Sequence, residues 1–410
     1  MQPGMRFTSG ITTEETVERL VPDLVGQIQA QFGSNLSPGV IDLALVFISA
    51  QWTNAVQDIV QLLRDELCPG TLLGCTAEGV IGREQEIEER PAIALVAAQL
   101  PGVILTPIDL QLGENDWHKL LLDQEEFQCI VEAPEDTRLF ILLGDPFSTP
   151  MDDVLESFNA CYPGIPVIGG MASGALRSQG NTLIMDDQFT HEGVVGLALS
   201  GALEVDVVVS QGCRPIWRPF KVAAAHRNII FDLEGRPPLA WLQDLIPELP
   251  EEDRLLLQNG LFVGRAIKPG QETLGRGDFL IRGVMGIDQQ SGAIAIGDSV
   301  IEGETIQFHL RDALTAQEDL EMMLIPQMFR DPPSGGLLFS CNGRGTRLYD
   351  HPNGDIAVVQ RSLENIHLAG FFCAGEIGPI AGANFLHGHT ASLALFRPLG
   401  EATSGEHNQN

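Results

Sequence analysis

The sequence predicts an α/β fold with mixed β-sheets and flanking helices, arranged in two domains and built from repeated α-β-α-β-β-β units. Buried-strand runs alternate with amphipathic helical segments along most of the chain, a pattern typical of α/β proteins. The same order of segments recurs in three places. Strands that follow one another late in each unit can pair as hairpins, so we expect mixed sheets. The chain of 410 residues is also longer than one ordinary hydrophobic core supports.

The first unit opens with a helix after Thr12 and Thr13, because Glu14 and Glu15 suit the positive end of a helix dipole. Its apolar residues keep the spacing of one helical face: Val17, Leu20, Val21, Leu24, Val25 and Ile28. The rest of the unit is expected as a strand, a helix and three strand-like runs at 43–49, 53–67, 71–79, 92–100 and 103–110.

The second and third units repeat this order. The second is expected as helices and apolar runs at 115–122, 138–145, 151–160, 166–174, 193–200 and 203–212. The third has a helix at 315–329, a strand at 336–345, a short helix or loop, and strands within 366–378 and 390–396. Between them lies an extra stretch, 213–310, which begins with an expected interdomain connection and continues with a helix and four strands near 261–267, 279–288, 293–300 and 305–310.

Three glycine-containing segments can be laid over one another: 73–79, 168–174 and 371–377. This overlay places Cys75, Gly170 and Cys373 at matching positions of the three units. Similar strand–glycine–strand segments also arise by chance in α/β proteins. Duplication of the unit is therefore a hypothesis that the arrangement of the strands must test.

The net charge excludes nucleic-acid binding through phosphate neutralisation and disfavours docking on anionic lipid. The chain carries 24 basic and 55 acidic residues, a formal net charge of −31. A nucleic-acid binder that neutralises phosphates needs clustered Lys and Arg, and docking on anionic lipid needs the same. We therefore expect neither nucleic acid nor membrane insertion among the partners.

The lack of a recognisable targeting signal and the cysteine usage favour a cytoplasmic protein. No apolar run is long enough to span a membrane, and no signal peptide is recognisable at the start. Seven cysteines, an odd number without a CxxC pair, argue against a disulfide framework and a structural zinc site. The polar residues 401–410 are expected to be a disordered tail.

The densest cluster of chemically active residues lies in three loops, 341–345, 373–379 and 384–389. Ligands of open α/β sheets bind where strands end, and glycines there let backbone N–H groups approach an anion. Arg344 could receive an anionic group and Glu376 an ammonium, so a zwitterion such as an amino acid is the predicted ligand. The predicted ligand-binding set is Cys341, Asn342, Arg344, Cys373, Glu376, Asn384 and His387. Alternatively, Arg344 and Glu376 pair with each other and merely hold two loops together.

Other chemistries receive less support from the residues. Cys373 could act as a nucleophile if His387 or His389 served as its base. A possible second site consists of Gly74, Cys75 and Glu78, for which no neighbouring histidine supplies a base. The histidines form no metal-binding motif, and haem ligation by one of them is possible but cannot be assigned: His118, His226, His309, His351 or His387. No cofactor is therefore predicted.

Several segments resemble one known family. The run LLGCTAEGVIG (72–82) is similar to the signature of the amino-terminal FIST domain. The carboxyl-terminal FIST domain is resembled, in order, by GDFLIRGVMGID, GAIAIGDSV, TIQFHLRDA, LLFSCNGRG and GFFCAGEIGPIAGANFLHGHTASLALF. The resemblance covers nearly the whole chain and implies a FIST N-like domain at 1–212 and a FIST C-like domain at 213–400.

That resemblance implies a sensory module for small ligands, with amino acids as the proposed ligand class. Some family members resemble haem-based nitric oxide sensors. Our leading hypothesis is a cytoplasmic, non-enzymatic sensory protein that binds a small polar, amino-acid-like ligand and signals through a separate partner protein. The alternatives are a haem-based nitric oxide sensor and, third, a cysteine-dependent enzyme.

Overall fold

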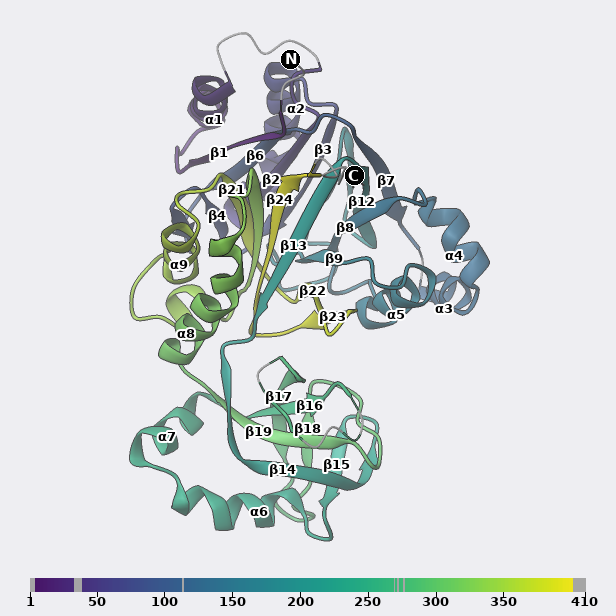
Figure 1. Cartoon of the computed structure of the whole chain (residues 1–410), viewed down its shortest axis with the longest axis vertical. Coiled ribbons are helices and arrows are strands. Elements are labelled where there is room, and N and C mark those ends of the chain that lie inside the picture. The colour runs from purple at the N-terminus through teal and green to yellow at the C-terminus, as the bar shows by residue number, and fades with distance from the viewer. Residues whose placement is uncertain are drawn as a thin grey trace, which may run out of the picture.

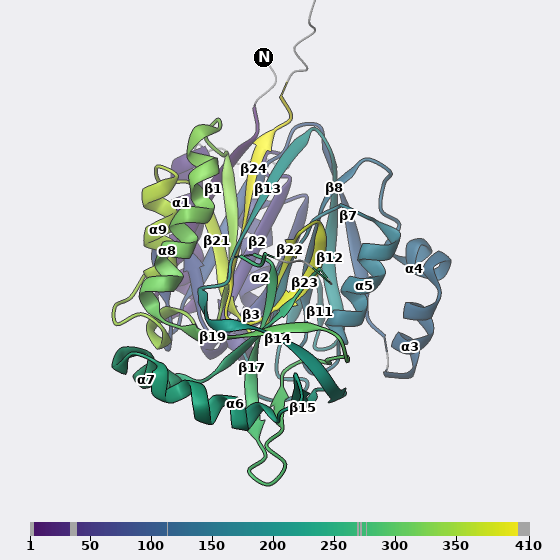
Figure 2. The ribbon, with the colours of Figure 1, turned by 60° about the horizontal axis from the view of Figure 1, so that its bottom comes forward.

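Three six-stranded sheets surround a common core, helices cover their outer faces, and a closed β-barrel is attached at one end of this body (Figure 1). The structure is a computed structural model that describes residues 4–32, 39–112, 114–268, 270, 273–275 and 277–400. The predicted tail, 401–410, lies outside the described residues. Figure 2, turned so that the barrel comes forward, shows the helices standing outside the sheets.

The first unit contains β1 (Arg6–Thr12), α1 (Val17–Phe32), β2 (Leu43–Ser49), α2 (Val56–Leu67), β3 (Thr71–Ala77), the hairpin β4 (Val80–Gly82) and β5 (Gln85–Ile87), and β6 (Ile93–Gln99). The second contains β7 (Val103–Leu110), α3 (Glu114–Leu122), α4 (Gln124–Val131), β8 (Thr137–Gly144), α5 (Met151–Cys161), β9 (Val167–Met171), the hairpin β10 (Leu183–Met185) and β11 (Gln188–Thr190), and β12 (Val194–Gly201).

The third unit contains β13 (Leu203–Ser210), α8 (Ala313–Leu324), β20 (Gly335–Cys341), α9 (Gly354–Ser362), β21 (Leu368–Cys373), the hairpin β22 (Glu376–Ile380) and β23 (Ala383–His387), and β24 (Ala391–Pro398). The barrel is inserted between β13 and α8. It consists of β14 (Cys213–His226), β15 (Ile229–Leu233), β16 (Phe262–Ala266), β17 (Phe279–Ile287), β18 (Ile294–Ile296) and β19 (Thr305–Arg311), with α6 (Pro238–Leu245) and α7 (Glu251–Leu256) beside it.

Each unit donates its hairpin to the sheet of another unit. The strand orders are β1-β6-β2-β3-β10-β11, β7-β12-β8-β9-β22-β23 and β13-β24-β20-β21-β4-β5. The central strands pair in parallel and the outer ones antiparallel, so the sheets are mixed as predicted. The cyclic exchange interlocks the three units, and the third sheet therefore contains strands from both ends of the chain.

The predicted period is confirmed, but its frame shifts by one strand. The run at 103–110 forms β7, which pairs with β12 in the second sheet rather than closing the first. Likewise, β13 pairs with β24 in the third sheet. The strand β1 was not predicted. The run 214–228, expected as an interdomain connection, instead contains nearly all of the long barrel strand β14.

A glycine in the third strand of each unit marks the true correspondence. Each of the three pairs with an isoleucine of the donated hairpin: Gly74 with Ile184, Gly169 with Ile377 and Gly370 with Ile81. A Cβ atom at these glycines would lie 2.2, 1.8 and 1.6 Å from the carbonyl oxygen of the neighbouring strand. Real Cβ atoms do not approach backbone oxygen so closely, so these positions require glycine.

This correspondence corrects the predicted match of the cysteines. Counting from the three glycines, Cys75 and Gly170 are equivalent, and their counterpart in the third unit is Phe371. Cys373 lies two residues further along and corresponds to Ala77. A shift of two residues keeps a side chain on the same face of a strand, so Cys373 still points into the common core.

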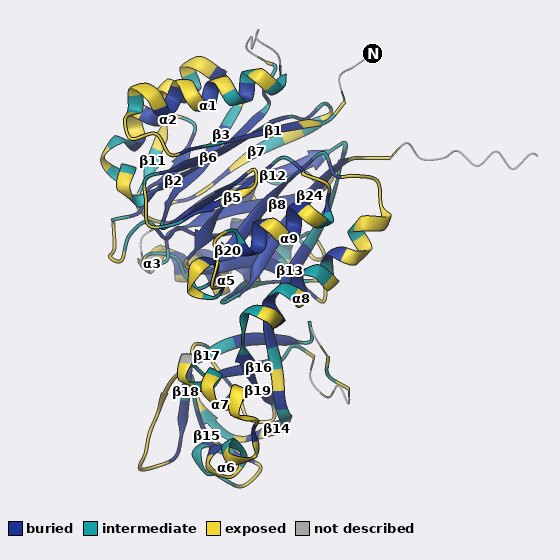
Figure 3. Ribbon diagram, turned by 90° about the vertical axis from the view of Figure 1, so that its left-hand side faces the viewer, coloured by how far each residue is buried: buried dark blue, intermediate teal, exposed yellow. Residues whose placement is uncertain are grey.

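Side chains alternate between two cores, as expected for strands that are covered on both faces. In β2, Leu43, Leu45 and Phe47 point into the common core, and the intervening residues pack against α1 and α2. Figure 3 shows the sheets almost wholly buried and the helices exposed on their outer faces. Full burial of one large apolar side chain contributes roughly 1.5–3 kcal/mol. Among the described residues, no helix combines the length and hydropathy needed to cross a membrane.

Candidate functional site

The predicted loops meet where β20 and β21 end, and the inserted barrel closes one side of this place. Cys341 and Cys373 are register partners at the carboxyl ends of these parallel strands. The backbone N–H of Asn342 donates to Cys373 O at 2.8 Å, and that of Cys341 donates to Thr390 O at 2.9 Å. Arg311, the last residue of β19, reaches in from the barrel.

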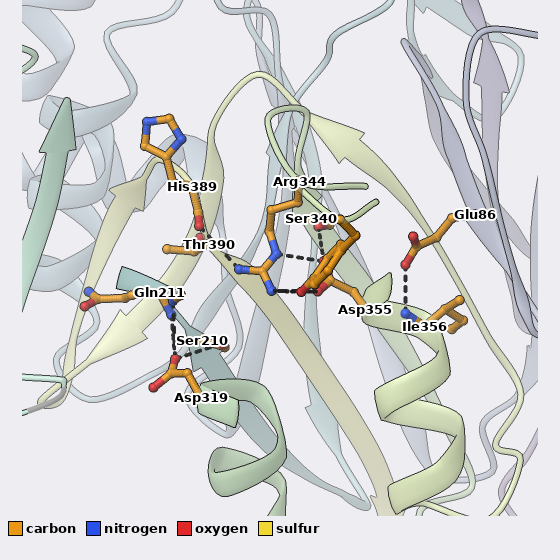
Figure 4. A network of polar contacts seen from close by, with 12 residues as sticks. Glu86, Ser210, Gln211, Asp319, Ser340, Arg344, Asp355, Ile356, His389 and Thr390 are labelled. Atoms are coloured by element: carbon orange, nitrogen blue, oxygen red, sulfur yellow. Dashed lines mark hydrogen bonds and ion pairs between the residues drawn. The ribbon is translucent and has the colours of Figure 1, made fainter. Parts of the chain in front are cut away.

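Arg344 is fully buried and is held by a carboxylate that the sequence analysis did not single out (Figure 4). Its Nε and Nη2 donate to the two carboxylate oxygens of Asp355 at 2.7 and 2.6 Å. Ser340 Oγ and Tyr349 Oη each donate to Asp355 at 2.7 Å as well. Burial alone would raise the pKa of Asp355, but Arg344 and these hydrogen bonds hold that pKa below its usual value.

This ion pair corrects one of the two interpretations of Arg344. The residue does not pair with Glu376, because Asp355, at the start of α9, occupies its Nε and Nη2. The remaining nitrogen, Nη1, makes a long contact of 3.5 Å with His389 O. Gly212 lies against the same nitrogen: a Cβ atom there would be 2.7 Å from it.

A neighbouring glutamate supports the start of α9. Glu86, in the hairpin donated by the first unit, accepts the backbone N–H of Ile356 at 2.7 Å (Figure 4). Burial, followed by the nearby charge of Asp355, raises the pKa of Glu86 to about 8. The hairpin exchange therefore helps to position Asp355.

Glu376 is fully buried and has one carboxyl oxygen without a strong donor. Its Oε2 accepts from the backbone N–H of Thr390 at 3.0 Å and from the hydroxyl of Thr390 at 2.9 Å. Within the described part of the chain, Oε1 has no hydrogen-bond partner, and the weak thiol donor of Cys341 interacts with the carboxyl group of Glu376. Burial raises the pKa of Glu376 to about 8.

Arg311 is a charged residue of this place that was not among the predicted site residues. Its Nη1 contacts His389 Nδ1 at 3.1 Å, whereas Nε and Nη2 are buried and find no acceptor in the described residues. Burial, followed by the charge of Arg344, lowers the pKa of Arg311. The sequence could have indicated Arg311 by its position, because it follows an expected strand in TIQFHLRDA, a segment that resembles the family.

Gly343 brings these groups close together. A Cβ atom at this position would lie 3.3 Å from Arg311 Nη1, 3.5 Å from His389 Nδ1 and 3.7 Å from Cys341 Sγ. Burial lowers the pKa of His389 to about 4, so its ring is neutral and Nδ1 accepts from Arg311. The ring packs edge-on against Phe262 of the barrel, with centroids 4.8 Å apart. The site thus joins the barrel to the three-sheet body.

The chain matches two domain families in succession. Residues 42–236 match the FIST N domain and residues 238–379 match the FIST C domain. The chain belongs to the FIST family. Similar proteins include an uncharacterized protein of Mycobacterium tuberculosis, 37% identical over 395 residues that span 96% of this chain and 100% of that protein. Another, from Mycobacterium bovis, is 35% identical over 394 residues, 96% of this chain and 99% of its own.

One solved structure aligns over the same length. The crystal structure of cyanuric acid hydrolase from A. caulinodans covers 97% of this chain and 100% of its own, with a TM-score of 0.34 and 8% sequence identity. A likeness at this level carries no argument about the fold or the activity of the FIST protein.

Three residues of the predicted set are used elsewhere in the FIST protein. Asn384 Oδ1 accepts the N–H of Val167 at 2.8 Å, which fixes the donated hairpin to the second sheet. His387 Nε2 contacts Gly378 O at 2.9 Å within the hairpin, and burial lowers its pKa to about 4. Cys373 is enclosed in the common core. The fold therefore brings together Cys341, Asn342, Arg344 and Glu376. Cys373 and His387 are the strand partners of Cys341 and Glu376, but the Cys373 side chain points into the common core and the His387 ring binds within its own hairpin.

The geometry gives little support to the possible second site or to a reactive thiol. Gly74 and Cys75 are buried within β3, and Glu78 forms an ion pair with Arg347. Burial raises the pKa of Cys341 to about 12, so this thiol stays protonated at neutral pH. In the parts of the chain that the structure describes, no three His, Cys, Asp or Glu side chains are placed to hold a metal ion.

Proposed function

We propose that this FIST protein is a sensory protein that binds an amino-acid-like zwitterion between Arg311 and Glu376. The observation that carries the proposal is the pair of buried, unpartnered nitrogens on Arg311. An unsatisfied buried polar group costs about 1–3 kcal/mol, and more when it is charged. A ligand that supplies the missing acceptor recovers this free energy.

Arg344 and Asp355 provide an internal template for the carboxylate contact. Arg344 binds Asp355 through Nε and Nη2, the two nitrogens that form one planar fork. Arg311 leaves the same two nitrogens without a partner. A ligand carboxylate is therefore expected to take at Arg311 the position that Asp355 takes at Arg344.

Glu376 supplies the opposite charge for the ammonium group. Its Oε1 is available, while Thr390 fixes the carboxyl group through Oε2. Because burial raises the pKa of Glu376 to about 8, the Glu376 carboxyl group is mostly protonated at pH 7 when no ligand is bound. An ammonium ion favours the ionised carboxylate, so binding releases a proton, and the affinity should rise up to about tenfold per pH unit from pH 6 toward pH 8.

Ligand binding must change the structure in a way that a separate signalling protein can recognise. Arg311 is followed directly by Asp312 and α8, so a ligand at Arg311 acts on the junction between the barrel and the outer helices of the third sheet. Ordering of this junction is the proposed signal.

A thermal-shift screen of free amino acids, followed by calorimetric titration, tests the proposal. Each hit is compared with its amine and its carboxylic acid, which lack one of the two charges. Loss of one hydrogen-bonded charge removes about 1.5–3 kcal/mol, so Arg311→Gln should weaken binding roughly 10- to 150-fold.

A matched control is Arg214→Gln, because Arg214 lies on the opposite face of the same barrel strand pair and is paired with Asp253 and Asp312. This control should leave the affinity unchanged. If no amino acid binds, or if Arg311→Gln binds as tightly as the wild type, the proposal is wrong.

A further inference from the structure

A cavity lies where the barrel meets the three-sheet body, and neither Arg311 nor Glu376 is among its wall residues. Its volume is about 370 Å³. The walls come from β13, the start of β14, β17, β19, α8 with the following turn Ile325–Phe329, and the tip of the β22–β23 hairpin. Small-molecule sites of proteins have volumes of roughly 300–1,000 Å³ and favour junctions of this kind.

The walls of this junction cavity are mostly apolar. Apolar wall residues come from both the body and the barrel: Val207, Val209, Cys213, Phe279, Met323 and Ile380. Among the described wall residues the charged one is Asp319, whose Oδ2 accepts from Ser210 Oγ at 2.8 Å and from Gln211 N at 3.0 Å (Figure 4). A carboxylate in the wall of a chain with net charge −31 disfavours an anionic occupant.

Two polar groups of the wall can accept hydrogen bonds. His309 contacts the carbonyl oxygen of Gln307 through Nδ1 at 3.0 Å. Because a carbonyl oxygen can accept but not donate, Nδ1 carries the proton, and in the neutral ring Nε2 is an acceptor. Burial lowers the pKa of His309 to about 4, so the ring is neutral at pH 7.

Gln327 supplies the other acceptor. Its Oε1 is buried without a partner among the residues that the structure describes. The ring of His309 lies close against Gly264, where a Cβ atom would lie 2.5 Å from the ring carbon Cε1. The cavity thus offers acceptors in a fixed place on otherwise apolar walls.

We propose that the junction cavity binds a neutral, largely apolar small molecule that carries an N–H or O–H donor, such as an aromatic heterocycle. The apolar walls bury its ring, and Gln327 Oε1 and His309 Nε2 accept its donor. Because the walls belong to both parts of the molecule, an occupant holds the barrel against the body. This site is independent of the proposed amino-acid site.

The test uses the full-length protein with indole and benzofuran, two rings of closely similar shape that differ in an N–H donor. Ligand-observed NMR titration should give an indole affinity roughly 5- to 150-fold above that of benzofuran, because benzofuran leaves the buried acceptors unpaired. Gln327→Leu should reduce this preference, and Gln61→Leu on the exposed face of α2 should not. Equal affinity of the two rings for the wild type, or no binding of either, overturns the proposal.

Filling the cavity provides a second line of evidence. Val209→Trp should abolish indole binding, and Met323→Trp takes its place if circular dichroism shows that the first variant is unfolded. Indole binding that persists in a folded filled variant overturns the proposal. Arg311→Gln should bind indole like the wild type, which separates the outcome for this cavity from the outcome for the amino-acid site.

Discussion

Replacing Asp355 with asparagine would leave the guanidinium of Arg344 buried without its counter-charge. Four hydrogen bonds converge on the Asp355 carboxylate: two from Arg344 and one each from Ser340 and Tyr349. Both members of the pair have no exposed side-chain surface. Removal of one partner of such a pair costs about 3–5 kcal/mol, whereas joint replacement by apolar residues of similar volume is often neutral or stabilising.

Urea denaturation followed by circular dichroism measures this loss. Asp355→Asn and Arg344→Met should each lower the free energy of unfolding by about 3–5 kcal/mol, and Arg344→Met with Asp355→Leu should cost much less than the sum. In our proposal Arg311, and not Arg344 as the sequence predicts, holds the ligand carboxylate, so folded Arg344→Met should retain its ligand affinity. A loss below about 1 kcal/mol for Asp355→Asn, or additive losses in the double variant, would refute the reasoning.

Three further results are expected. Burial raises the pKa of Glu376 from 4.5 to about 8, so its contribution to the free energy of unfolding falls by about 1.4 kcal/mol per pH unit between these values. Glu86, whose pKa is also raised to about 8, adds to this slope. Glu376→Gln should reduce the slope in urea denaturation at pH 5 to 8 by about 1.4 kcal/mol per pH unit, and an unchanged slope argues against a buried, protonated Glu376. Gly370→Ala should cost at least the roughly 1–3 kcal/mol of overpacking by the same assay, and Gly286→Ala, with open space around it, should not; similar losses would contradict the close approach. Maleimide should modify exposed Cys129 in the native protein but Cys373 only after unfolding, as mass spectrometry would show, and rapid native labelling of Cys373 would contradict its burial.

The sequence predicted much of the fold because strand periodicity is a local signal. Long runs such as 43–49 and 138–145 alternate between two cores and were recognised. The hairpin exchange could not be predicted, because β4 and β5 are three residues each and β4 pairs with β21, a strand from the other end of the chain. The offset of Cys373 arose for a similar reason: two-residue shifts preserve strand faces, and pairing alone distinguishes them.

The sequence predicted which loops meet at the ends of β20 and β21, but not the contacts of their side chains. Loop glycines and polar residues located the ends of β20 and β21, which depend on local sequence. The partner of Arg344 could not be recognised, since Asp355 lies in a helix start that was read as a short helix or loop. Arg311 belongs to the inserted barrel, so only the three-dimensional fold reveals that it lies beside Gly343, His389 and Cys341 and within reach of the charge of Glu376.

A crystal structure with the tightest-binding amino acid of the screen tests the central claim most directly. We expect the ligand carboxylate to accept from Nε and Nη2 of Arg311 and the ligand ammonium to donate to Oε1 of Glu376, with the Arg344–Asp355 pair unchanged. A ligand bound elsewhere, or a carboxylate held by Arg344 after release from Asp355, would contradict the account.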